Sequence, residues 1–101
     1  MATSTIKNNG LKKASTWAEA VANGTEIVVT AVGNAGGNNI GLSVTIPVAE
    51  LSSTSRLWLS GASYNGQAFE YLQVSATLTS YTANLYHGSG TITSTKSIYY
   101  R

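Results

Sequence analysis

Four glutamates are the only acidic residues in this 101-residue chain, so carboxyl-group catalysis would have to use them. Glycoside hydrolysis needs two carboxyl groups about 5 to 10 Å apart, one of them with a raised pKa. Glu50 follows one expected strand and Glu70 begins another, so the two could meet as a hydrolytic pair. Solvated strand ends account for them equally well, and we predict a protein that is not an enzyme.

Histidine and cysteine chemistry is limited further. His87 is the only histidine and the chain has no cysteine, which removes multi-histidine metal sites, cysteine-ligated zinc, disulfides and thiolate nucleophiles. A Ser-His-Glu triad would be the one remaining catalytic use of His87. Because His87 begins the glycine turn 87–90, we interpret it as a surface residue and expect neither a metal nor a cofactor.

Two patterns typical of phosphate or nucleic-acid binding are incomplete. The glycine-rich segment 32–37 follows an expected strand, but no helix and no Lys-Ser or Lys-Thr pair stands behind it to hold a phosphate. Six basic residues against four acidic ones leave a net charge of only +2. The basic residues are spread along the chain rather than gathered in a stripe, so we expect no nucleic-acid partner.

Aromatic residues suggest a binding surface instead. Trp58, Phe69 and Tyr71 are expected to point away from the aliphatic stripes of their own strands. Tyrosine and tryptophan bury a large area at interfaces while keeping a polar group for hydrogen bonds. We therefore expect core or subunit contacts, with the alternative that Trp58, Tyr64 and Tyr71 form a platform on which a sugar ring stacks.

The composition limits the possible fold classes and the number of domains. Charged residues make up 10% of the chain, against roughly 25% in an average soluble domain, so serine, threonine, asparagine and glycine supply most of the polarity. Hydrophobic residues reach 43%, which is enough for a core and excludes a disordered composition. We expect one domain, residues 11–101, preceded by an arm of residues 1–10. Oligomerisation would stabilise so small a domain, which hides only about two-thirds of its chain surface.

The N-terminal third contains the only expected helix. Apolar residues at 14, 17, 18 and 21 follow a helical spacing, and the Asn-Gly pair at 23–24 is a C-terminal stop, so we predict a short helix over 11–23. The β-branched segment 26–32 is predicted to be a buried strand, and 33–39 a glycine- and asparagine-rich loop.

Alternation of apolar and polar residues is clearest after residue 39. The apolar side chains that predict one buried face are Ile40, Leu42, Val44, Ile46 and Val48. Pro47 cannot donate a hydrogen bond to a neighbouring strand. That end of the strand is therefore expected at a sheet edge or a bulge.

Further strands are predicted at 56–60, 68–79, 82–86, 91–93 and 97–101. In the first of these, Leu57 and Leu59 should point one way and Trp58 the other. In the second, the expected inward residues are Leu72, Val74, Ala76 and Leu78. The turn 87–90 should join a hairpin. About seven short strands separated by turns predict an all-β fold, an antiparallel β-sandwich or jelly roll, with the short N-terminal helix added.

Membrane insertion is not expected. The first eleven residues have no apolar region of a signal peptide, and no segment approaches the roughly 20 apolar residues that cross a bilayer. We therefore expect synthesis in the cytoplasm.

The C-terminal part of the chain resembles a known class of domains. The residues that carry this resemblance are Ile46-Pro47-Val48-Ala49-Glu50-Leu51, Ser55-Arg56-Leu57-Trp58, the long serine- and threonine-rich strand, and Ser97-Ile98-Tyr99-Tyr100-Arg101. Over residues 40–101 the chain is similar to small β-sandwich domains at the C-terminal ends of tailed-phage fibre, baseplate and other host-contacting proteins. The resemblance implies a virion component, commonly a homotrimer, that adsorbs to host-surface carbohydrate.

The chain departs from that class in two ways. It is far shorter than a tail fibre, and it lacks a coiled-coil or triple-β shaft. No binding residue carries over, because receptor contacts in such domains lie in variable loops. Our leading hypothesis is a phage-type structural protein that forms a homo-oligomer, a trimer, and either recognises a host glycan or packs against other virion proteins. The alternatives are a monomeric carbohydrate-binding module, a capsid decoration protein and a hydrolase that uses Glu50 and Glu70.

Overall fold

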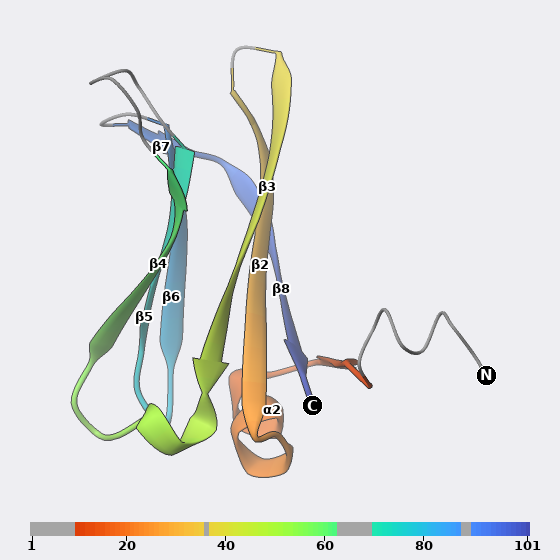
Figure 1. Ribbon diagram of the computed structural model, residues 1–101, viewed down its shortest axis with the longest axis vertical. Coiled ribbons are helices and arrows are strands. Elements are labelled where there is room, and N and C mark those ends of the chain that lie inside the picture. The colour runs from red at the N-terminus through yellow and green to blue at the C-terminus, as the bar shows by residue number, and fades with distance from the viewer. Residues whose placement is uncertain (1–9, 36, 63–69, 88–89) are drawn as a thin grey trace.

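The computed structural model describes residues 10–35, 37–62, 70–87 and 90–101. Over these ranges the chain forms two four-stranded antiparallel sheets that face one another, with one short α-helix at one end (Figure 1). The predicted all-β sandwich is confirmed, although the described residues form eight strands rather than about seven.

The first sheet has the strand order β1-β8-β2-β3. Its strands are β1 (Lys12–Ala14), β2 (Glu26–Ala35), β3 (Asn38–Pro47) and β8 (Ser94–Tyr100). The prediction of a loop over 33–39 was wrong, because β2 and β3 stay paired as far as Ala35 and Asn38. Within this stretch Asn34 Nδ2 donates to Asn39 Oδ1 at 3.1 Å, so asparagines that suggested a loop instead bridge the two strands.

The second sheet is a meander in the order β4-β5-β6-β7. Its strands are β4 (Arg56–Ala62), β5 (Glu70–Ala76), β6 (Tyr81–His87) and β7 (Gly90–Ile92). The predicted hairpin is confirmed, since His87 pairs with Gly90. The strand predicted to reach residue 79 ends at Ala76. Thr77 N–H donates to Ser80 O at 2.8 Å in a turn, which leaves Leu78 44% exposed instead of inward.

The helix prediction was right only for its second half. The helix α2 covers Trp17–Asn23, whereas Lys12–Ala14 form β1 and pair with β8. Thr16 explains the boundary, because it is the N-cap of the helix. Thr16 Oγ1 accepts from Glu19 N–H at 3.1 Å, and Ser15 N–H donates to Glu19 Oε1 at 2.9 Å. Reciprocal bonds of this kind satisfy N–H groups that the first helical turn leaves open.

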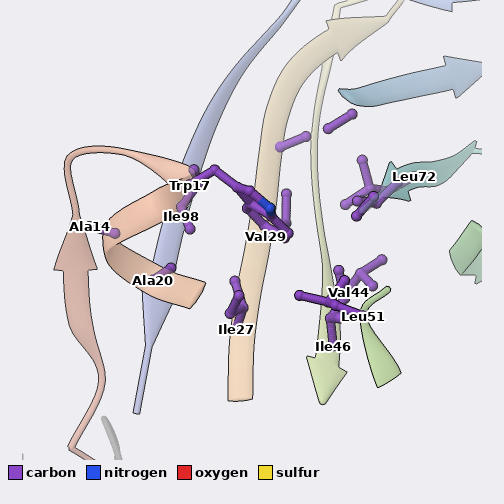
Figure 2. Close-up of a cluster of buried hydrophobic side chains, with 14 of the residues drawn as sticks. Ala14, Trp17, Ala20, Ile27, Val29, Val44, Ile46, Leu51, Leu72 and Ile98 are labelled. Carbon is purple, nitrogen blue, oxygen red and sulfur yellow. The ribbon is translucent and has the colours of Figure 1, made fainter. Parts of the chain in front are cut away.

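The core lies between the two sheets, and α2 closes one end of it (Figure 2). Its buried side chains come from both sheets and from α2, and the largest ones with under 2% exposure are Ile27, Ile46, Leu72, Leu85, Val29 and Val74. Trp17 extends from α2 toward Val29 in the same view. Its ring stacks on Tyr81, with centroids 4.8 Å apart, and its Nε1–H donates to Thr77 O at 3.0 Å.

The chain changes sheets after β7 with Thr93 as the single connecting residue. This crossing requires close approach to Gly33 of β2. A Cβ atom added at Gly33 would lie 2.8 Å from Thr93 O and 3.0 Å from Ile92 Cγ2. Glycine is therefore needed here for space.

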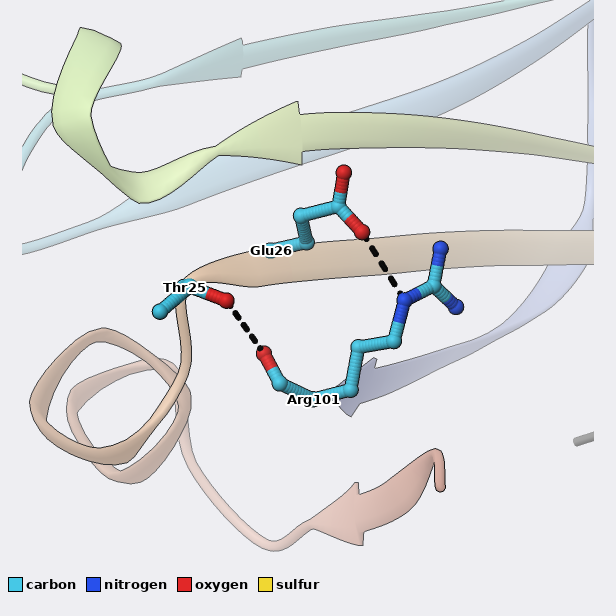
Figure 3. Close-up of polar contacts among 3 residues, drawn as sticks. All are labelled: Thr25, Glu26 and Arg101. Carbon is cyan, nitrogen blue, oxygen red and sulfur yellow. Dashed lines mark hydrogen bonds and ion pairs between the residues drawn. The ribbon is translucent and has the colours of Figure 1, made fainter. Parts of the chain in front are cut away.

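The end of β8 is tied to the start of β2 by several polar contacts (Figure 3). The main-chain oxygen of Arg101 accepts from Thr25 N–H at 2.8 Å and from Thr25 Oγ1 at 3.0 Å. Arg101 Nε also donates to Glu26 Oε1 at 2.8 Å. These contacts hold the two strands in register next to the helix.

Two tyrosines beside α2 predict an alkaline loss of stability. Burial raises the pKa of the Tyr81 phenol, and burial together with the hydrogen bond to Glu19 raises the pKa of the Tyr100 phenol. A raised folded pKa favours the neutral phenol in the native state. The contribution of each phenol to stability is therefore complete below the pKa of the unfolded chain, near 10, and is lost as pH rises through the pKa of the folded protein. We expect the free energy of unfolding to fall above about pH 10.

Urea unfolding followed by circular dichroism at a series of pH values tests this dependence. Because lysines titrate in the same range, the informative comparison is with the Tyr81→Phe, Tyr100→Phe double variant. Its unfolding free energy should depend less steeply on pH than that of the wild type. Equal slopes for the two proteins would contradict the prediction.

Candidate functional site

The structure places two of the predicted sugar-binding residues on opposite faces of the second sheet. Trp58 lies across from the buried Val74 and packs against the core, whereas Tyr71 is on the outer face. The third, Tyr64, and the aromatic Phe69 lie outside the described residues. A platform that combines Trp58 with Tyr71 is therefore not formed.

The prediction that Trp58 points away from Leu57 and Leu59 is confirmed, and so is the position of Tyr71 opposite the inward residues of its own strand. In β4 the tryptophan faces inward, and Leu57 and Leu59 face outward. An aromatic ring on the core side of a strand buries a large apolar area, and Trp58 packs there against the buried cluster. The guanidinium carbon of Arg56 lies 5.5 Å from the centroid of the Trp58 ring and partly covers it.

The outer face of the second sheet is the most distinctive surface among the described residues. The alternation of buried and exposed positions and the register of β4–β7 define its members, which are Leu57, Leu59, Gly61, Tyr71, Gln73, Ser75, Thr82, Asn84, Tyr86 and Thr91. None of these residues is charged. We call this set the outer face.

Two leucines stand out on the outer face. Leu57 is 56% exposed and Leu59 is 65% exposed. Leu59 pairs with Gln73 and borders a shallow depression of about 290 Å³, lined also by Ser60 and Tyr71. Two adjacent exposed leucines beside tyrosines form an apolar patch, and such patches mark interaction sites more often than scattered single residues do.

The tyrosines of the outer face stack on one another. The rings of Tyr71 and Tyr86 have centroids 4.7 Å apart and planes inclined by 13°. These two residues are directly opposite in the β5–β6 register, which is the position where cross-strand aromatic pairs stabilise a sheet. Because each ring covers one face of the other, the pair is not laid flat as a two-ring surface for a sugar.

The two glutamates considered for hydrolysis are not brought together. Glu50 lies in the 3-10 turn Val48–Glu50 and forms an ion pair with Arg56 at 3.0 Å. Arg56 pairs with Ala76 at one end of β5, whereas Glu70 begins the other end. Six residues of strand separate these ends, a distance of about 20 Å. The two carboxyl groups therefore cannot act on one glycosidic bond.

The side chains of His87 and Glu70 form a hydrogen-bonded pair on the second sheet. His87 Nδ1 lies 2.9 Å from Glu70 Oε2 across the β5–β6 register, and both side chains are near half exposed. An open depression of about 550 Å³ adjoins His87, with Asn34 and Thr91 among its lining residues. Within the described part of the chain no serine hydroxyl is bonded to His87, so the pair lacks the nucleophile of a triad.

Residues 10–35, 37–62, 70–87 and 90–101 contain no group of three or more histidine, aspartate, glutamate or cysteine side chains that could hold a metal ion. The helix in these ranges is also too short and too polar to cross a membrane. Comparison of the chain with known protein families, with curated proteins and with solved structures finds no match. Function must therefore be argued from the surface itself.

Leu57, Leu59 and Tyr86 were not among the candidate site residues predicted from sequence. The signal that could have identified the leucines is the Leu-Trp-Leu order of 57–59, in which an alternating strand must expose either both leucines or the tryptophan. Tyr86 could be found only through its pairing with Tyr71, which depends on the β5–β6 register.

Proposed function

We propose that this protein is a non-enzymatic structural domain that assembles with copies of itself through the outer face. The observation that carries the proposal is the exposure of Leu57 and Leu59 on an uncharged sheet face. Interface cores are depleted in charged residues and enriched in tyrosine, and the outer face has both properties.

The energetic gain from covering this patch is sizeable for so small a protein. Burying an exposed leucine side chain fully contributes about 1.5 to 3 kcal/mol. Leu57 and Leu59 are each more than half exposed, so covering both would contribute roughly 2 to 4 kcal/mol to association. The stacked Tyr71 and Tyr86 add a rigid surface that loses little side-chain entropy on contact.

The setting we propose is a phage virion, with the domain as a homotrimeric component that contacts a host surface or other virion proteins. This part of the proposal is supported by the resemblance of residues 40–101 to C-terminal domains of phage host-contacting proteins. The β-sandwich fold is compatible with it, and so is the low charge of the chain. Self-assembly through the outer face is a separate claim and can be tested without knowing the setting.

Size-exclusion chromatography with light scattering tests the self-assembly. The wild type should have the mass of an oligomer at high micromolar concentration. The Leu57→Glu, Leu59→Glu double variant should dissociate on the order of 100-fold more readily, because an oligomer would have to bury unpaired carboxylates.

Leu78→Glu is the matched control for this experiment. Leu78 is also an exposed leucine, at 44%, but it lies in the turn after β5 and outside the outer face. Its substitution should leave the oligomer mass unchanged. A monomeric wild type at every concentration, or a double variant that associates as strongly as the wild type, would contradict the proposal.

A further inference from the structure

The exposed edge of β3 is a second surface, and the hydrogen-bond pattern of the first sheet shows which of its groups are open. Val48 N–H donates to Thr25 O at 2.9 Å, just beyond the end of the β2–β3 ladder at Glu26 and Pro47. Glu26 instead exchanges two hydrogen bonds of 3.1 Å with Arg101 at the end of β8. Glu26 therefore turns its backbone toward β8 and away from its β3 partner, Pro47.

In an antiparallel ladder, hydrogen-bonded and non-hydrogen-bonded pairs alternate along the strands. The even-numbered residues of β3 consequently bond to β2, and the odd-numbered ones direct N–H and C=O to the open side. Pro47 fits this phase, because the N–H that it lacks would have pointed away from β2. The prediction from sequence that Pro47 lies at a sheet edge is confirmed, since β3 is the last strand of its sheet.

Four residues present both N–H and C=O at this edge, namely Asn39, Gly41, Ser43 and Thr45. All four residues are exposed and uncharged. Among the residues that the structure describes, none is hydrogen-bonded to these backbone groups. The ten-residue strand pairs with β2 without a bulge and has no charged side chain along its whole length.

Natural proteins usually protect sheet edges with lysines, bulges, short strands or prolines. In β3 only Pro47 serves this purpose, and it lies at one end of the strand. A long, straight and uncharged edge is a template for a further strand, which would satisfy the open donors and acceptors.

We propose that β3 pairs antiparallel with β3 of a second copy of this chain, about a two-fold axis that passes by Leu42. In this register Gly41 lies opposite Ser43 of the second copy, and Asn39 lies opposite Thr45. Every one of these pairs is hydrogen-bonded, because all four residues direct their backbone groups to the edge. The two edges together form roughly eight hydrogen bonds.

The side chains fit the same register on both faces of the sheet. On the outside, Gly41 next to Ser43 of the second copy brings together small neutral groups, so no charge is repelled. On the inside, the half-buried Leu42 meets its own counterpart, and the half-buried Ile40 meets Val44 of the second copy. The apolar layer of the sandwich thus continues across the axis.

A second copy satisfies this edge better than an unrelated strand for two reasons. The open groups are spaced symmetrically about Leu42, which is the requirement for a self-complementary contact about a two-fold axis. The uncharged strand also offers a partner no ionic group by which to select a different sequence. The contact would join two four-stranded sheets into one of eight strands.

This interface is distinct from the outer face, because β3 belongs to the first sheet and the outer face to the second. The test therefore uses the Leu57→Glu, Leu59→Glu background, in which association through the outer face is removed. Analytical ultracentrifugation over a concentration series compares Ser43→Pro with Ser43→Ala in that background. Proline removes an N–H that the monomer does not use, whereas alanine keeps it.

We expect the Ser43→Ala protein to form dimers and the Ser43→Pro protein to form them on the order of 30-fold more weakly, since each dimer loses two hydrogen bonds. Hydrogen exchange gives a second readout. In the background protein, the amides of Gly41 and Thr45 should become protected as concentration rises. Those of Leu42 and Val44 should be protected at every concentration, because they bond to β2.

Circular dichroism melting checks that Ser43→Pro is folded, and Thr45→Lys replaces it if it is not, because a lysine places a charge on the same edge. The proposal would be overturned if Ser43→Pro associated as strongly as Ser43→Ala. Where Thr45→Lys replaces Ser43→Pro, the same comparison applies to it. Edge amides that remain unprotected while the mass doubles, or a background protein that is monomeric throughout, would overturn the proposal as well. The edge amides could also become protected only when a peptide of unrelated extended sequence is added. That result would show that the edge binds a foreign strand rather than a second copy, and it would also overturn the proposal.

An oligomeric wild type whose Leu57→Glu, Leu59→Glu variant is monomeric would support the outer face and reject the β3 contact. The reverse pattern, with association lost in Ser43→Pro alone and unaffected by the glutamates, would support the β3 contact and reject the outer face. The two proposals can thus fail separately.

Discussion

Replacing Trp17 with alanine should lower the free energy of unfolding by about 3 to 5 kcal/mol, which is the cost usually found for truncating a buried tryptophan. Trp17 is 6% exposed and is the largest core side chain that α2 contributes. The change would remove its stacking on Tyr81 and leave Thr77 O without the hydrogen bond from the indole. It would also open one end of the sandwich to water.

The local consequence should be loss of the helix. A helix of seven residues has no independent stability in water, so α2 exists because Trp17 and Ala20 pack against the sheets. We expect the alanine variant to show faster hydrogen exchange in Trp17–Asn23 and also in β1, which precedes the helix. The strands of the second sheet should be affected less.

Urea unfolding followed by far-ultraviolet circular dichroism measures the loss in stability. Trp17→Phe is the informative intermediate, because phenylalanine keeps an aromatic ring but cannot donate to Thr77 O. It should cost less than the alanine change. Ala22→Ser, on the exposed side of α2, should stay within about 0.5 kcal/mol of the wild type. A Trp17→Ala variant that loses less than about 1 kcal/mol would show that Trp17 does not close the core.

Gly61→Ala should lower the free energy of unfolding by at least about 2 kcal/mol. Gly61 has φ +129°, a backbone conformation that residues with a side chain rarely adopt. A Cβ atom there would overlap Glu70 O and lie 2.6 Å from Tyr71 Cα. Both are backbone atoms of the neighbouring strand β5, so the contact can be relieved only by separating β4 from β5.

This substitution should also affect self-assembly, because Gly61 pairs with Tyr71 on the outer face. Separation of β4 from β5 would displace Leu59 relative to the stacked tyrosines, and we expect weaker association as well as a lower melting temperature. Thermal unfolding by circular dichroism and light scattering measure the two effects.

Gly41→Ala is the matched control. A Cβ at Gly41 would meet only Val32 Cγ2, at 3.8 Å, which is an ordinary contact. Its unfolding free energy should change by no more than about 0.5 kcal/mol. If Gly61→Ala and Gly41→Ala had the same stability, the close approach of β4 and β5 at Gly61 would be refuted.

Periodicity along the chain predicted those elements whose buried and exposed sides alternate without interruption. The strand around Val44 and Ile46 was found in this way, whereas the hairpin that joins β6 to β7 was predicted from the glycine turn 87–90.

The prediction was wrong for elements at which the local propensity of the residues competes with pairing or packing against distant parts of the chain. Ser15 and Thr16 were counted inside the helix, although Thr16 is its N-cap and Ser15 precedes it, because a serine or threonine can stand at a cap or inside a helix. A hydrogen-bonded ladder extends through residues 33–35 and 38–39, although their glycines and asparagines suggested a loop, because pairing with a partner strand outweighs weak local propensity.

The candidate site was predicted less well than the fold. The side that Trp58 faces could not be derived from β4 alone. It depends on whether the indole or the two leucines gain more from the core that the opposite sheet provides.

By itself the sequence determined that this protein is weakly charged, cysteine-free and all-β, with four glutamates and one histidine. These properties follow from composition and from the two-residue period of strands, which need no knowledge of neighbours. The tertiary structure alone decided that Glu50 and Glu70 lie apart, that the leucines of β4 face outward beside stacked tyrosines, and which backbone groups of β3 stay open along its edge. Each of these three features depends on which strands become neighbours. The order of strands in the sheets is set by the free energy of packing the whole sandwich.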